Sequence, residues 1–326
     1  MAADKGKIKF IANARCIGIL LVVFGHSFPF DVYISPVLWK IKDFIYVFHM
    51  PLFLFISGYL LTENHRSPGE YIRRRGTRLL IPYFALSLVA FVPKAIMQRF
   101  LNDSVDFSIQ HLVMTELVPR ENVWGHFWYI PVVFFLCCFG VLALNHMRKS
   151  HIIQAAVLIT TYVLLYLPET TAWFALEDVR KAAFYFVLGI TLADWNPDTC
   201  VISKSVWLFA FPIAFVLFRC GANVLYNSVI ALLMIGFVLH IGTRLPMRKT
   251  GLFAMIEKYS FTIFLLSWPA QAVIEVVCNK VLHLPALLVM GMMSLAGIAV
   301  PLICVKIVSL IDKRISVKWV KLAIGM

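Results

Sequence analysis

Long apolar runs, separated by short polar and basic connections, repeat along the whole chain. A membrane-spanning helix needs about 20 mainly apolar residues, because its backbone must be hydrogen-bonded internally across a hydrocarbon core of roughly 30 Å. The pattern predicts an all-α integral membrane protein with about ten transmembrane helices in a single bundle. These helices are expected to cover approximately residues 10–30, 41–61, 79–99, 126–145, 151–168, 181–195, 203–219, 222–241, 256–277 and 285–311.

The composition supports this class and argues against soluble proteins. Of the 326 residues, 61% are apolar and 14% are charged, against about 45–50% and 25% in soluble globular domains. The seven cysteines lie mostly inside apolar runs, so we expect neither a disulfide framework nor a metal site. Residues 1–326 are expected to form one transmembrane domain with no appended soluble domain. The longest connection, residues 100–125, is predicted on the outer side, and its length is typical of functional loops.

The basic residues predict the orientation of the chain. The net charge is +13, but it is distributed in short clusters between apolar runs, which indicates contact with an anionic membrane leaflet rather than with nucleic acid. If the N-terminus is cytoplasmic, 19 Lys and Arg residues fall in inner connections and 8 in outer ones. Since positive charge is enriched on the cytoplasmic side, both termini and residues 62–78 are expected there.

Two ionisable residues in the first apolar run are the strongest functional candidates. Arg15 and His26 are 11 residues apart, which on a helix is about three turns plus 20°, with a rise of roughly 16 Å. They therefore share one helix face. One interpretation is an arginine that reaches the cytoplasmic interface and a histidine hydrogen-bonded within the bundle. The other is a functional pair, because ionisable residues at membrane depth are costly and imidazole suits general-base catalysis.

A basic cluster precedes the third apolar run on the predicted cytoplasmic side. It contains Arg73, Arg74, Arg75 and Arg78. Guanidinium groups match phosphate oxygens in bidentate geometry, so the cluster is either a phosphate site or a topology signal alone. If the third helix already begins there, Arg75 and Arg78 are one turn apart on the same face.

Three further residues are candidates for binding a substrate on the outer side. His49 precedes Met50 and Pro51 in the second apolar run, and His126 and Trp128 lie at the outer end of the fourth. A Trp ring stacks on sugars, although aromatic belts also place Trp and Tyr at that depth. A histidine close to a helix-start proline also has a purely structural explanation.

Several segments, in this order, resemble membrane-bound acyltransferase family 3. They are the first helix with ten residues between Arg15 and His26, the stretch Phe48–Tyr59, the pair Arg75-x-x-Arg78, the stretch His126–Pro131 and the stretch Phe184–Gly189. The residues of the first two segments are most similar to the branch of fucose 4-O-acetylase-like and exopolysaccharide O-acetyltransferases. One segment departs from the pattern, because Phe264–Pro269 reads Phe-Leu-Leu-Ser-Trp-Pro where many members have Tyr-Leu-x-His-x-Pro.

The resemblance implies transfer of an acyl group, usually acetyl, from cytoplasmic acetyl-CoA to a hydroxyl of a cell-surface polysaccharide or lipid-linked glycan, with no metal. The implied location is the bacterial cytoplasmic membrane, and the implied partners are a glycan or glycolipid acceptor and membrane lipids. His26 is then the expected base and Arg15 binds or orients the donor. Arg75 and Arg78 are expected to hold the phosphates of CoA.

Two other functions fit parts of the pattern. A multispanning transporter or channel would use Arg15, His26 and His49 to line a polar path, but the chain lacks the paired internal repeats that many transporters show. A flippase or assembly scaffold would leave the Arg15 and His26 face and the basic cluster without a role. The pattern leaves open the acceptor, the length of the acyl group and the oligomeric state.

Overall fold

A computed structural model describes residues 2–29, 34–97, 108–122, 124–169, 173–195, 204–246 and 250–326. Within these ranges every regular element is helical. The chain divides into two compact units, one formed by Met1–Ile56 with Leu192–Ile307 and the other by Ser57–Thr191 with Val308–Met326. We refer to these as unit 1 and unit 2.

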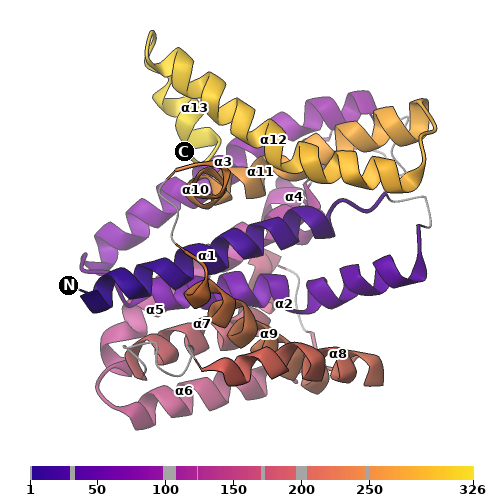
Figure 1. Cartoon of the computed structure of the whole chain (residues 1–326). Helices are drawn as coiled ribbons and strands as arrows, with labels where there is room; N and C mark the ends of the chain where they lie inside the picture. The colour runs from indigo at the N-terminus through magenta and orange to yellow at the C-terminus, as the bar shows by residue number, and fades with distance from the viewer. Residues whose placement is uncertain are drawn as a thin grey trace. The chain divides into compact units, whose positions relative to one another are not determined.

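Unit 1 is arranged around the first helix, α1, which packs side by side with α9 and α11 (Figure 1). None of the described side chains between residues 10 and 25 is exposed, as expected of a helix that is apolar on all sides. The elements wholly or partly in unit 1 are α1 (Ala2–Gly25), α2 (Pro36–Leu61), the end of α7 (Leu176–Trp195), the 3-10 helix η4 (Ser205–Phe209), α8 (Ala210–Cys220), α9 (Val224–Arg244), α10 (Leu252–Lys258), α11 (Ser260–Glu275), the π-helix η5 (Val276–Val281) and α12 (Ala286–Asp312).

A glycine and an asparagine allow α1 and α9 to approach closely. A Cβ atom on Gly242 would lie 2.7 Å from the Phe10 carbonyl oxygen, so a larger residue does not fit there without a shift. Asn13 Nδ2 donates to the carbonyl oxygens of Gly242 and Leu245, at 2.9 and 3.1 Å. These bonds hold the N-terminal half of α1 in a fixed register against α9.

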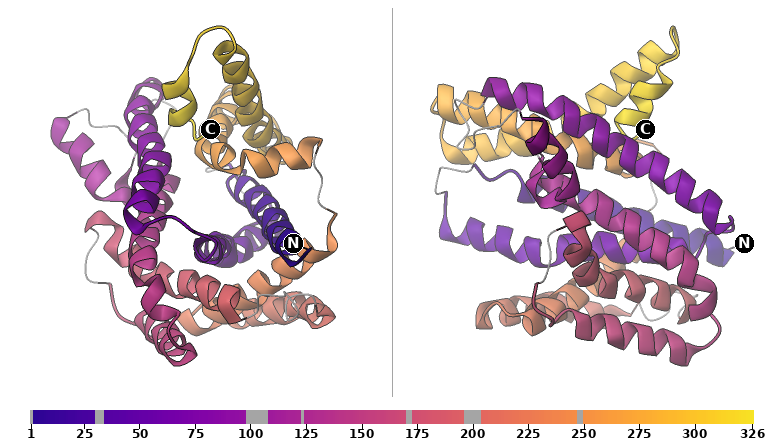
Figure 2. Two further views of the ribbon diagram at one scale, coloured as in Figure 1. Left: turned by 90° about the vertical axis from the view of Figure 1, so that its left-hand side faces the viewer. Right: turned by 180° about the vertical axis from the view of Figure 1, so that it is seen from behind.

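Unit 2 is arranged around α3 and α5, which lie side by side (Figure 2). The C-terminal helix α13 packs against α3. The elements wholly or partly in unit 2 are the end of α2, α3 (Pro68–Met97), α4 (Ile109–Leu117), the 3-10 helices η1 (Pro119–Glu121), η2 (Gly125–Trp128) and η3 (Trp173–Ala175), α5 (Tyr129–Met147), α6 (His151–Leu164), α7 (Leu176–Trp195), the end of α12, and α13 (Lys318–Ala323).

Each of the ten predicted segments overlaps at least one described helix, but only five of the described helical stretches are long and apolar enough to cross a membrane, so ten spans are not confirmed. Those five are Pro36–Leu61, Gly125–Met147, Val224–Arg244, Ser260–Val281 and Ala286–Asp312. Apolar side chains that are exposed on the last of these, such as Leu287, Leu295 and Ile303, form a surface suited to lipid. Shorter apolar helices cover Phe10–Gly25, His151–Leu164 and Ser205–Cys220.

Several predicted boundaries differ from the structure by a few residues, and two differences change the interpretation of the chain. The third helix, expected from residue 79, begins at Pro68, so the basic cluster lies on its first turns rather than in a connection. Proline is well suited to the start of a helix because its missing N–H is not needed there. The predicted outer connection 100–125 contains the short helix α4, while its residues 100–107 and 123 lie outside the described ranges.

Candidate active site

His26 lies directly after the last residue of α1, and its backbone N–H still donates to the Val22 carbonyl at 3.1 Å. Its side chain is partly exposed. The ring atom Nδ1 lies 3.2 Å from the hydroxyl of Tyr46 on α2, and this hydroxyl donates to the Gly25 carbonyl at 3.3 Å. The imidazole is thus both accessible and held by a polar neighbour, which are the two properties a general base needs.

His49 packs against the same tyrosine. The ring centroids of Tyr46 and His49 are 4.9 Å apart, and those of Tyr46 and His26 are 5.7 Å apart. His49 is 3% exposed, and its Nδ1 is 2.8 Å from the Ile45 carbonyl. Because a carbonyl only accepts, Nδ1 of His49 is the donor in this bond. The structure therefore brings two predicted site residues, His26 and His49, together around Tyr46.

A lysine surrounded by aromatic rings borders this site. Lys42 Nζ lies 4.3 Å from the ring centroid of Trp39, 5.5 Å from that of Phe28 and 5.6 Å from that of Tyr46. Contacts between an ammonium group and aromatic faces at these distances are attractive. Lys42 was assigned no role from the sequence, where it is one of several basic residues in a predicted outer connection.

Helix α11 contributes Gln271 to the end of α1. Gln271 is 1% exposed, and its Nε2 donates to the Val23 carbonyl and to Ser27 Oγ, both at 2.8 Å. The neighbouring segment Ser267-Trp268-Pro269, which departs from the family pattern, lies inside α11, and Ser267 is buried. The α11 side chain that binds the end of α1 is therefore the amide of Gln271, and not a histidine of the kind that many family members carry in the segment 264–269.

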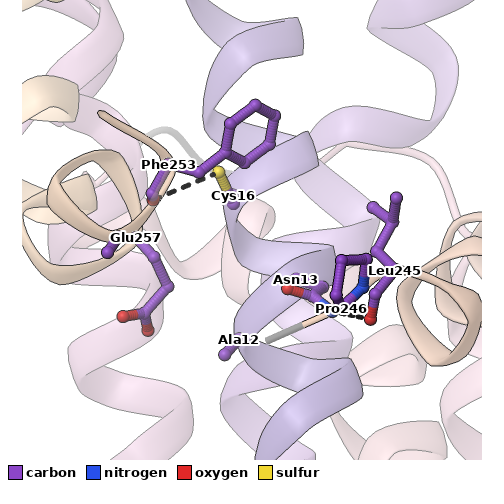
Figure 3. Close-up of a pocket in the computed structure, with 8 residues that line it drawn as sticks. Ala12, Asn13, Cys16, Leu245, Pro246, Phe253 and Glu257 are labelled. Carbon is purple, nitrogen blue, oxygen red and sulfur yellow. Dashed lines mark hydrogen bonds between the residues drawn. The ribbon is translucent and has the colours of Figure 1, made fainter. Parts of the chain in front are cut away.

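In the middle of α1, Arg15 forms an ion pair with Glu257 of α10. Both side chains are about one third exposed, at 33% and 29%. A cavity of about 110 Å³ adjoins this pair, and Figure 3 shows its residues. The cavity is lined by Ala12, Asn13, Cys16, Leu245, Pro246, Phe253, Ala254 and Glu257. Cys16 is a weak donor to the Phe253 carbonyl, at 3.9 Å. Most of the lining residues are apolar, and Glu257 contributes one carboxylate.

In unit 2 the basic cluster lies on the first turns of α3 and presents its members differently. Arg75 is partly buried, and its Nε donates to the Tyr71 hydroxyl at 3.0 Å. Arg73, Arg74 and Arg78 are exposed. The early start of α3 places Arg75 and Arg78 one turn apart, as the i, i+3 spacing requires. Both are thus positioned on the same helix, with Arg75 held by a tyrosine.

His126 and Trp128 lie in the 3-10 helix η2, which precedes α5. His126 is 9% exposed and packs on Phe127, with ring centroids 4.7 Å apart. The guanidinium carbon of Arg120 lies 4.3 Å from the ring centroid of Trp128, and Arg120 Nε donates to both carboxylate oxygens of Asp178, at 3.1 and 3.0 Å. Trp128 is therefore held by a cation that is itself anchored.

A buried polar cluster connects α3 with the region around α4, and none of its residues was predicted to belong to the site. Asn122 Nδ2 donates to Ser87 Oγ at 2.8 Å and to the Tyr83 hydroxyl at 3.4 Å. Glu116 lies in the same cluster. Burial raises the pKa of Glu116 to about 7, although hydrogen bonds from Ser87 and Tyr83 act in the opposite direction. A carboxyl group that titrates near neutral pH is a typical feature of functional sites.

A family model described as an acyltransferase domain matches residues 8–306, which spans both units. The chain belongs to acyltransferase family 3. Family 3 membership confirms the resemblance inferred from the five sequence segments. Together with its apolar helices, it identifies the chain as a multipass membrane protein. No solved structure matches the chain.

Two curated relatives of this family 3 chain are nodulation proteins NolL. The protein from Mesorhizobium japonicum is 27% identical over 216 residues, which is 64% of this chain and 54% of the relative. The protein from Sinorhizobium fredii is 29% identical over 212 residues, which is 59% of this chain and 51% of the relative. The chain thus spans about half the length of the curated relatives it matches.

Proposed function

We propose that the chain transfers an acyl group, in the simplest case acetyl, from cytoplasmic acyl-CoA to a hydroxyl of a cell-surface polysaccharide or lipid-linked glycan. The observation that carries this proposal is His26, an imidazole directly after the apolar helix α1 that is hydrogen-bonded to Tyr46, in a chain of acyltransferase family 3. Acyl transfer to a hydroxyl needs a base beside the hydroxyl, and an imidazole held by a neighbouring hydroxyl group supplies one.

In this proposal His26 takes the proton of the acceptor hydroxyl as its oxygen attacks the thioester carbonyl. The carbon–sulfur bond then breaks, and the CoA thiolate receives the proton from the imidazolium. His49, His126 and Trp128 are proposed to contact the acceptor. Arg15 is proposed to orient rather than to bind the phosphates of the donor, because Glu257 already pairs with its guanidinium.

The experiment that tests this function measures acyl transfer by the purified protein in lipid nanodiscs. Radiolabelled acetyl-CoA is supplied with total glycolipid of the source organism, and label in the glycan fraction is counted together with released CoA. Transfer, or slow thioester hydrolysis without an acceptor, supports the proposal. If the protein does neither but moves a solute in proteoliposomes, a transporter function replaces it.

We further propose that both units together form one transmembrane acyltransferase domain in the bacterial cytoplasmic membrane, with both termini and residues 62–78 in the cytoplasm. The enrichment of basic residues in the expected inner connections supports this orientation. Ser67 is exposed and directly precedes α3. The cysteine of a Ser67→Cys variant is expected to resist an impermeant thiol reagent in intact cells. The same cysteine should react after the cells are permeabilised. Labelling in intact cells would contradict the orientation and the donor site together.

Arg75 and Arg78 are proposed to hold the phosphates of the donor. Replacing both with Ala is expected to raise the apparent KM for acetyl-CoA at least tenfold with a smaller change in kcat, because ground-state binding is lost. Arg75→Lys should be only partly active, since it keeps the charge but loses the planar fork. The matched control is Arg66→Ala, which removes an exposed arginine that pairs with Glu70 outside the cluster. An unchanged KM in the double variant would reduce the cluster to a topology signal.

A further inference from the structure

The Tyr46 hydroxyl contacts two groups at the end of α1, the Gly25 carbonyl at 3.3 Å and His26 Nδ1 at 3.2 Å. We propose that Tyr46 is a positioning residue that fixes the tautomer of His26, with the proton on Nδ1 and the lone pair on Nε2. This inference rests on the proposed function, in which His26 is the base. It adds which ring nitrogen accepts the proton and which residue determines that choice.

The single hydrogen atom of the Tyr46 hydroxyl determines which ring nitrogen of His26 carries a proton. A tyrosine hydroxyl has one hydrogen to donate and lone pairs to accept, whereas a carbonyl only accepts. If the hydroxyl donates to the Gly25 carbonyl and accepts from Nδ1–H, both contacts are hydrogen bonds. If it donates to Nδ1 instead, the contact with Gly25 joins two oxygens with no proton between them. The first arrangement makes one more hydrogen bond, and it places the lone pair on Nε2.

The packing around Tyr46 keeps the hydroxyl in this position. A Cβ atom on Gly25 would lie 3.0 Å from Tyr46 Cε2, so the absence of a side chain at Gly25 allows the ring to reach the end of α1. The ring packs edge-on against His26 and His49, at 64° and 62° to their planes. Lys42 Nζ lies 5.6 Å from its centroid. The ring is therefore bordered by both histidines and by the ammonium group.

This arrangement matches the general organisation of a base and the group that orients it. In that organisation one ring nitrogen donates to a fixed acceptor, and the other nitrogen takes the proton of the nucleophile. The Tyr46 oxygen accepts from Nδ1–H both before and after Nε2 is protonated. It therefore stabilises the imidazolium more than the neutral ring, because a bond from a charged donor is stronger. No proton has to move on Tyr46 during the reaction.

Tyr46→Phe removes the hydroxyl and keeps the ring. We expect kcat to fall about 3- to 10-fold, as for the loss of one hydrogen bond of about 1 kcal/mol, with an unchanged KM for acetyl-CoA. The acid limb of the pH–rate profile should move to lower pH, because the acceptor that stabilises the imidazolium is gone. The other titratable groups near the ring are Lys42, Asp43 and His49 on α2, with Glu275 of α11 acting on Lys42, and this variant retains all four.

A matched control and a measurement independent of turnover complete the test. Tyr226→Phe removes a hydroxyl on α9 in the same unit and should change neither kcat nor the pH profile. In ¹⁵N-histidine NMR, with the His26 signal assigned from its loss in His26→Ala, the wild-type ring should be protonated on Nδ1. A proton on Nε2, or an acid limb that moves to higher pH in Tyr46→Phe, would overturn the inference.

The outcomes separate this inference from the proposed function. If His26→Ala is inactive but Tyr46→Phe has the wild-type kcat and pH profile, His26 remains the base and Tyr46 does not position it. If the wild type transfers no acyl group, the function fails, and the NMR measurement still decides whether Tyr46 sets the tautomer.

Discussion

Replacing His26 with alanine is expected to lower acyl transfer by about 10²–10⁴-fold, the range that general-base catalysis typically contributes. His26→Gln should be equally inactive, because an amide forms hydrogen bonds but does not take the hydroxyl proton. The variants should still be found in the membrane in normal amounts, since His26 is partly exposed, and Tyr46 and Gln271 bind the backbone at the end of α1 through carbonyl groups and not through the imidazole. The measurement is initial rate at saturating acetyl-CoA.

His65→Ala provides the matched control for this prediction. His65 is exposed in the connection between α2 and α3, so its removal should leave the rate unchanged. Near wild-type activity in correctly inserted His26→Ala would show that His26 is a packing residue. The base would then be sought at His49, at His126, or at Glu116, because the pKa of Glu116 near 7 also suits proton transfer at neutral pH.

The sequence predicted where most of the described helices lie, because helix position depends on local pattern. Apolar runs of sufficient length identify helices that cross a membrane, and an Arg or His inside such a run is conspicuous. The start of α3 was placed 11 residues late, since the segment between Pro68 and Arg78 is basic and only its neighbour is apolar. Hydropathy identifies the part of a helix inside the membrane, and α3 extends beyond that part.

The partners of these residues could not be predicted from the sequence, because they are distant in the chain. Glu257 is 242 residues from Arg15, and Gln271 is 244 residues from Ser27. Tyr46 lies nearer to His26, but a tyrosine in an apolar run looks the same whether it faces lipid or a histidine. What makes Tyr46 significant is the direction of its hydroxyl, and that direction depends on how α2 packs against α1.

A second large effect is expected at Gly58, in the part of α2 that belongs to unit 2. A Cβ atom there would lie 1.9 Å from the carbonyl oxygen of Phe186 on α7. This neighbour is backbone and has no alternative rotamer, so α2 and α7 would have to separate. Helix association in membranes depends on close packing of small residues, and overpacking in a core typically costs about 1–3 kcal/mol, occasionally more. Gly58→Ala should therefore be strongly destabilised, and Gly58→Leu should not accumulate as folded protein.

The measurement is thermal unfolding of the purified variants in detergent, followed by size-exclusion chromatography. Gly291→Ala is the matched control, because Gly291 lies inside α12 with no atom within 4 Å of its Cβ position. Alanine there should be neutral or stabilise by up to about 1 kcal/mol, as a glycine inside a helix is unfavourable.

An unfolding temperature of Gly58→Ala equal to that of the wild type would mean that α2 and α7 do not approach as closely as described. A loss of stability confined to Gly58 would show that this contact, and not helix propensity, requires the glycine. Since α2 also carries Tyr46 and His49, activity should fall together with stability in Gly58→Ala and stay unchanged in Gly291→Ala.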